Sequence, residues 1–137
     1  MLTYNLGVVT SRNGGGSGTS LLTTGYQPGT SSNGISTRGL GAFSVKLNIV
    51  KGGATSIDVR VMDYTDPANP RILQTRDEAV DGGATTGSRN YTADTVTELT
   101  GDLRGVVDAL AVEVRGNGGI NGSSSVVAAL YAAELPR

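Results

Sequence analysis

The chain has 137 residues and a formal net charge of −1, and 37% of its residues are hydrophobic but only 4% aromatic. This length accommodates one domain. The sequence contains no Cys and no His, which excludes disulfides, thiolate chemistry, a Ser-His-Asp triad and His-ligated metals. The small net charge provides no long-range attraction to nucleic acid or to anionic lipid. No stretch reaches the roughly 20 apolar residues of a membrane helix. We therefore expect a protein without enzymatic activity, nucleic-acid partner or membrane span.

The first third of the chain combines short strands with a flexible composition. Leu2–Val9 and Leu21–Thr24 are predicted strands, and 21 of the 32 residues in Thr10–Gly41 are Gly, Ser or Thr. Such a composition buries little apolar surface and is typical of an extended arm. We expect this arm to lie against its own sandwich or against another subunit. The predicted organisation is a strand and arm over residues 1–41 and a body over residues 42–137.

Period-2 alternation dominates the body. Leu40–Val50 and Ala54–Tyr64 each place apolar side chains on one face and mainly polar side chains on the other. The residues between them, Lys51–Gly53, tolerate the positive φ angles of a tight turn. The sequence therefore predicts a hairpin of two half-buried strands.

The middle of the chain contains turn and loop signals. Asp66–Pro70 ends the preceding strand, because proline cannot donate to a β-ladder. Arg71–Asp77 is predicted as a short strand and Ala79–Ser88 as a loop. The segment Thr92–Leu103 is ambiguous: its apolar residues have helical spacing, but its threonines favour a strand. We favour a strand over Tyr91–Leu99.

A second predicted hairpin closes the chain. Val106–Arg115 alternates, a Gly-rich turn follows at residues 116–122, and the last strand is Ser124–Leu135. Both faces of this last strand are apolar, so we expect it at the centre of a sheet or covered by a neighbouring subunit. Together the segments predict an all-β fold, a single jelly-roll-like β-sandwich of seven or eight short strands.

Carboxylates are the main acid-base groups available. Asp63, Asp66 and Asn69 have an oxygen-rich spacing that suits calcium, although the same residues are ordinary turn formers. Asp77–Glu78 and Asp81 border a Gly-rich loop and are expected to form a solvated rim. A small hydrolase would need a carboxylate pair across a pocket, and the sequence does not indicate one.

The glycine runs and the lysines have structural explanations. Gly14–Gly18 and Gly116–Gly119 lack the following helix and the Lys-Ser/Thr ending of a phosphate loop, so we interpret both as turns. Lys46 and Lys51 are expected to be exposed, solubilising charges on the predicted hairpin. The sequence therefore predicts no catalytic, cofactor-binding or metal-binding residue.

Tyrosines provide the alternative of a carbohydrate-binding β-sandwich module. Such a module would stack sugar rings on at least two tyrosines exposed on one face or loop cluster. The candidates are Tyr26, Tyr64, Tyr91 and Tyr131.

The profile as a whole resembles a known class of proteins. The residues behind the resemblance are the arm Thr10–Gly41 and the strands Leu40–Val50, Ala54–Tyr64, Val106–Arg115 and Ser124–Leu135. A small sandwich without Cys and His that carries such an arm resembles tailed-phage virion proteins, most closely capsid decoration (cement) proteins.

The resemblance implies a non-enzymatic protein that binds and stabilises a shell of major capsid protein. It also implies homotrimers at local threefold positions, with the arm reaching across coat subunits. The expected location is the capsid surface of the virion, after synthesis in the host cytoplasm, because Met1–Asn5 lacks the features of a signal peptide. A tail or head-fibre protein is the alternative within the same class. No motif allows a site residue of the family to be assigned here.

Overall fold

Strands account for all the regular structure in the part of the chain that the structure describes. The computed structural model describes residues 3–12, 19–20, 35–73, 75, 88–118 and 124–134. In chain order the strands are β1 (Thr3–Arg12), β2 (Thr19–Ser20), β3 (Ile35–Ser36), β4 (Leu40–Val50), β5 (Ser56–Asp63), β6 (Arg71–Ile72), β7 (Ser88–Tyr91), β8 (Thr95–Asp102), β9 (Ala109–Asn117) and β10 (Ser125–Glu134).

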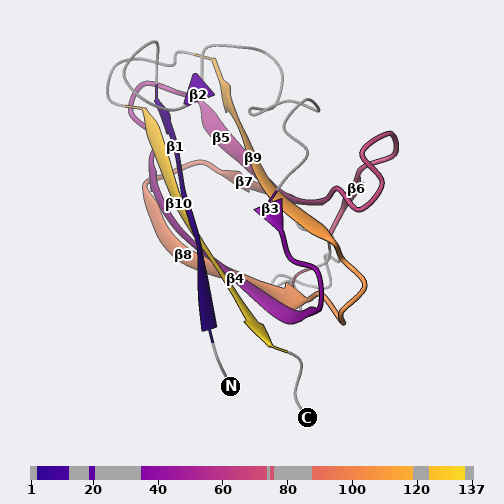
Figure 1. Cartoon of the computed structure of the whole chain (residues 1–137). Coiled ribbons are helices and arrows are strands. Elements are labelled where there is room, and N and C mark those ends of the chain that lie inside the picture. Colours follow the sequence, from indigo (N-terminus) through magenta and orange to yellow (C-terminus); the bar gives the residue numbers. More distant parts are fainter. Residues whose placement is uncertain are drawn as a thin grey trace.

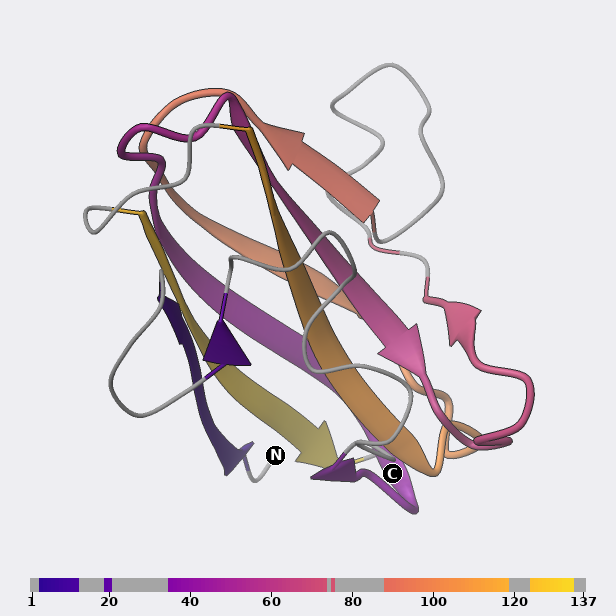
Figure 2. The ribbon, with the colours of Figure 1, turned by 90° about the horizontal axis from the view of Figure 1, so that it is seen from above.

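The strands form two sheets that pack face to face (Figures 1 and 2). Sheet A has the order β2-β1-β10-β4-β8, and sheet B has the order β3-β9-β5-β6, with β7 also paired to β5. Strands β6 and β7 share one edge of β5, at its end and at its start. Without β2 and β6, the orders β1-β10-β4-β8 and β3-β9-β5-β7 are those of an eight-stranded jelly roll. The predicted all-β, jelly-roll-like sandwich is confirmed.

The first predicted hairpin is wrong, although its strands and its turn are present. β4 pairs with β10 and β8, whereas β5 pairs with β9 in the other sheet. The connection is an arch between the sheets, with Gly52 at a φ of 57°. Its residue Ala54 is fully buried. The alternation of apolar and polar side chains predicts which face of a strand is buried. The same alternation occurs whether the next strand pairs in the same sheet, as in a hairpin, or crosses to the other sheet, as in an arch.

The second predicted hairpin is wrong for the same reason. β9 belongs to sheet B and β10 to sheet A, so these consecutive strands do not pair. The two arches are joined at one end of the sandwich. The backbone N–H of Thr55 donates to the carbonyls of Asn117 and Gly118, at 2.8 and 2.9 Å. The hydroxyl of Ser124 donates to the carbonyl of Lys51 at 2.8 Å.

The strand predicted in the ambiguous segment is confirmed as a strand, but it is divided between the sheets. β7 ends at Tyr91 in sheet B, and β8 begins at Thr95 in sheet A. Between them Asp94 accepts a hydrogen bond from the backbone N–H of Lys51 at 2.9 Å. This bond ties the β7–β8 connection to the arch after β4.

Other predicted elements are confirmed in part. β1 corresponds to the predicted first strand, and the predicted strand from Arg71 is observed only as β6. The predicted strand Leu21–Thr24, most of the predicted loop Ala79–Ser88 and most of the arm lie outside the described residues. The division of the chain at residue 41 stays a prediction.

The core lies between the two sheets, where the inward side chains of the long strands meet. Val45, Val59 and Leu130 are each 0% exposed. As predicted from its two apolar faces, β10 is a central strand, placed between β1 and β4. The buried inward residues of these strands are Phe43, Val45, Leu47, Ile49, Ile57, Val59, Val61, Leu99, Leu110, Val112, Val114, Val126, Ala128, Leu130 and Ala132.

Candidate functional site

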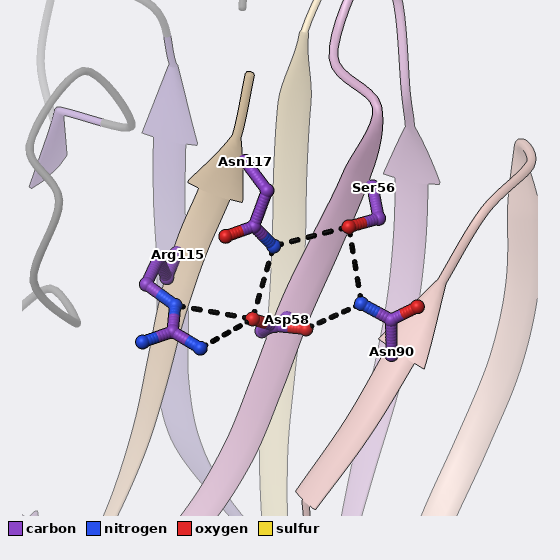
Figure 3. A network of polar contacts seen from close by, with 5 residues as sticks. All are labelled: Ser56, Asp58, Asn90, Arg115 and Asn117. Carbon is purple, nitrogen blue, oxygen red and sulfur yellow. Dashed lines mark hydrogen bonds and ion pairs between the residues drawn. The ribbon is translucent and has the colours of Figure 1, made fainter.

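A polar network crosses three strands on the outer face of sheet B (Figure 3). The register places Asp58 of β5 between Asn90 of β7 and Arg115 of β9. Two residues earlier on β5, Ser56 lies opposite Asn117. Because side chains directly opposite one another in antiparallel strands are neighbours, the ladder itself brings these five residues together.

Asp58 is the centre of this network and is only 7% exposed. One carboxylate oxygen accepts a hydrogen bond from Asn90 Nδ2 at 2.6 Å. The other accepts from Asn117 Nδ2 at 3.0 Å and from Arg115 Nε and Nη2 at 3.0 and 2.7 Å. Ser56 Oγ accepts from the same two amides at 3.1 Å each.

The network keeps Asp58 ionised. Burial by itself raises the pKa of this carboxyl, but the hydrogen bonds from Asn117, Asn90 and Arg115, together with the charge of Arg115, lower it below its ordinary value. A general acid needs a raised pKa and a base needs an accessible lone pair. Asp58 has neither, because both oxygens are occupied by its neighbours. The arrangement therefore ties β7, β5 and β9 together.

We expect the stability of the protein to fall in acid partly through Asp58. Because the folded pKa is depressed, the carboxylate stabilises the fold above its unfolded pKa of about 3.9, and this stabilisation is lost as the pH falls through the folded value. Urea unfolding of the wild type and of Asp58→Asn across a pH series measures this. The free energy of unfolding of the wild type should exceed that of Asp58→Asn by its full amount near neutral pH, and this difference should shrink progressively below about pH 5. An advantage that is constant with pH would contradict the assignment.

A second polar cluster lies on the same face, one step along the strands. Glu113 of β9 is 0% exposed and lies opposite Arg60 of β5. Its Oε1 accepts from Arg60 Nε at 2.8 Å and pairs with Nη2 at 2.7 Å, and its Oε2 accepts from the hydroxyl of Tyr64. Burial, with the bond to Glu113, raises the pKa of Tyr64 to about 12. This carboxylate is also fully engaged by the protein itself.

The predicted oxygen-rich turn is a turn held by its own hydrogen bonds. Asp63 is buried and accepts from Thr65 N at 2.8 Å, and it pairs with Arg71 at 3.3 Å. Asp66 accepts from Ala68 N and Asn69 Nδ2, each at 3.1 Å, and the bond from Asn69 is the first cause of its lowered pKa. These contacts match the turn alternative. The acidic rim expected at residues 77, 78 and 81 lies outside the described residues.

The candidate tyrosines that the structure describes do not form a common platform. Tyr64 is 1% exposed and bonded to Glu113, so it cannot stack on a ligand. Tyr91 lies on β7 of sheet B and packs against the core, whereas Tyr131 lies on β10 of sheet A. Tyr26 is outside the described residues.

The structure describes both lysines and the start of the second glycine run. Gly118 has a φ of 49° at the end of β9, which agrees with a turn. Lys51 folds over its own arch and donates to the carbonyl of Ala54 at 2.5 Å. Lys46 is exposed, and its Nζ lies 5.3 Å from the centre of the Tyr131 ring. The run Gly14–Gly18 lies outside the described residues.

The outer face of sheet A contrasts with that of sheet B. Its central strand β10 presents Val127, Ala129, Tyr131 and Ala133, all half-buried. The edge strand β8 presents Val96, which is 83% exposed. Two shallow hollows of about 480 and 230 Å³ lie along this face. A third cleft, of about 490 Å³, lies between β6 and the end of β8, where the opposite charges of Asp63 and Arg71 pair.

Sequence reasoning missed both polar clusters on sheet B. The signal available was the placement of Ser56, Asp58 and Arg60 at alternate positions, matched by Glu113, Arg115 and Asn117. The matching becomes meaningful only when β5 and β9 are known to pair, and the predicted hairpins paired these strands with others.

Among the described residues, no group of three or more acidic side chains could hold a metal ion, and no helix is long and apolar enough to cross a membrane.

Comparisons with known proteins add no assignment. No protein-family model, no curated protein and no solved structure matches the chain.

Proposed function

We propose that this chain is a non-enzymatic structural protein of a tailed-phage virion, a capsid decoration protein that binds and stabilises the shell of major capsid protein. The observation that supports this best is the outer face of sheet A. It offers a broad sheet surface of small and apolar side chains beside exposed charges. Surfaces of this type suit contacts between the protein chains of an assembly, of the same or of another kind.

The jelly-roll strand order agrees with the proposal, because viral capsid proteins are among the proteins with this fold. Because one fold hosts many functions, the strand order by itself identifies no site. The state of the carboxylates supports a non-enzymatic role more directly. Asp58, Asp63 and Glu113 are each occupied by neighbouring side chains or backbone groups. Asp63 lines the cleft beside β6 together with Asp102, but it accepts from Thr65 N and pairs with Arg71.

The proposed partner is the major capsid protein, and the proposed assembly is a homotrimer on the outer surface of the capsid. A tail or head-fibre position is the alternative within the virion. The fold also occurs in lectin domains, so a carbohydrate-binding module is the alternative outside the virion class. We rank it second, because Tyr64, Tyr91 and Tyr131 do not share an exposed face.

We expect the protein to be a component of purified particles. Virions from the biological source of the gene would be purified on a density gradient, immunoblotted with antibodies against the recombinant protein and labelled with immunogold. The protein should sediment with the particles, and gold should decorate the head.

Gold on the tail would transfer the proposal to the tail or fibre position. Absence of the protein from particles would overturn the virion role. Recombinant protein that binds a glycan array but no particle would establish the carbohydrate-binding alternative. Particles treated with pre-immune serum are the control for the labelling.

A further inference from the structure

The register of sheet A arranges its outer face in rows that cross β8, β4 and β10. One row is Val96, Asn48 and Val127, and the next is Glu98, Lys46 and Ala129. In antiparallel strands such directly opposed side chains lie close together. The face therefore has an acidic and apolar side on β8, and a basic and small-residue side on β4 and β10.

The charges on this face are not neutralised within the copy. Glu98 and Lys46 are cross-strand neighbours, yet no ion pair joins them, and Glu98 has no hydrogen bond in the described structure. Lys46 instead lies over the ring of Tyr131, with Nζ at 5.3 Å from its centre. An exposed carboxylate and an exposed ammonium group are thus both available to a partner that presents the opposite charges.

The face also combines an exposed apolar side chain with a shallow hollow. Val96 is 83% exposed and projects from the edge strand. The hollow of about 480 Å³ is bordered by Val96 and Glu98 of β8 as well as by Lys46, Val127 and Ala129. The exposed valine and the hollow therefore belong to one continuous patch, which a second copy can cover.

One buried polar atom on this face lacks a partner. The hydroxyl oxygen of Ser44 is buried and makes no hydrogen bond. It lies in the row between Thr100 and Tyr131, at the second hollow, of about 230 Å³. An unsatisfied buried hydroxyl costs free energy. The polar groups in this part of the face are therefore less fully hydrogen-bonded than those in the networks of sheet B.

We propose that the outer face of sheet A is the surface by which copies of this chain contact one another, with Val96 and Glu98 of one copy against Lys46, Val127 and Ala129 of the next. The inference deepens the proposed structural role and rests on it for its biological meaning. A second copy is the occupant favoured by charge complementarity, because the same face supplies both signs.

The test is a charge exchange followed by sedimentation velocity. Across a concentration series at low salt, the wild type should associate. Glu98→Lys and Lys46→Glu should each weaken association about tenfold, whereas the double variant with both changes should recover it, because the pair is restored with reversed polarity. High salt should weaken the wild type, since exposed charges are screened.

A matched pair of valines tests the apolar part of the contact. Val96→Ser should weaken association roughly tenfold or more, because a valine side chain is no longer buried at the contact. Val106 is 70% exposed but lies in the β8–β9 connection, so Val106→Ser should leave association unchanged. Thermal melts of every variant establish that a change in association is not a loss of folding.

Two outcomes overturn the inference. A wild type that remains a monomer throughout the series eliminates the contact, and association that survives both single charge changes and Val96→Ser places the contact on another surface. Neither outcome depends on whether the protein is found on particles, so failure of this inference and failure of the proposed virion role are distinguishable.

Discussion

Glu113→Ala should be among the most destabilising single substitutions in sheet B. Removal of the carboxylate leaves the guanidinium of Arg60 and the hydroxyl of Tyr64 without the acceptor that both now use. Breaking a buried pair by removing one partner costs about 3–5 kcal/mol. Urea unfolding at neutral pH, analysed as a two-state transition, measures the loss as a lower midpoint.

Two milder variants separate the charge from the shape in this cluster. Glu113→Gln keeps an oxygen acceptor for Arg60, and Tyr64→Phe removes only one hydroxyl. We expect each to cost about 1–2 kcal/mol, clearly less than the alanine variant. If Glu113→Ala unfolded at the same urea concentration as the wild type, the cluster would not contribute to stability.

Asp58→Ala is the second substitution with a large expected effect. It removes the acceptor of four hydrogen bonds, two from Arg115 and one each from Asn90 and Asn117. Arg115 is partly exposed, with 35% of its side chain accessible, and water therefore compensates some of its loss. We expect a destabilisation of about 2–4 kcal/mol and a Tm lower by roughly 10 °C.

The control is a carboxylate with local contacts only. Asp66 is exposed and bonds within its own turn, so Asp66→Ala should destabilise the protein much less than Asp58→Ala. Equal losses of stability in the two alanine variants would show that the cross-strand network stabilises the protein no more than an ordinary turn carboxylate does. Thermal melts followed by far-UV circular dichroism compare the two variants under identical conditions.

The two clusters explain how sheet B keeps its register. A slip of one residue between β5 and β9 would move every side chain to the opposite face. It would also separate Asp58 from Arg115, and Glu113 from Arg60, which face each other only in the observed register. Because each buried charge needs its partner, the networks penalise misaligned pairings as well as stabilise the native one.

The sequence alone determined most of the long strands and the orientation of their faces. The alternation within Leu40–Val50 predicted the bounds of β4 without error, because burial of every second side chain is a local property of an extended chain. The apolar character of both faces of Ser124–Leu135 likewise predicted a central strand as one of two alternatives, and β10 is central. Asp63, Asp66 and Asn69 form the turn that was one of their two alternatives.

Only the tertiary structure decided which strands are neighbours. Consecutive strands such as β4 and β5 cross between sheets, so pairing joins residues far apart in sequence, such as Asp58 and Arg115. Local alternation contains no information about such partners. For the same reason Glu113 and Tyr64, which alternation places on an outward face, are buried in a cluster that no segment of the sequence indicates by itself. The faces of the strands follow from local chain geometry, whereas the polar networks and the contact face of sheet A follow from the pairing of distant strands.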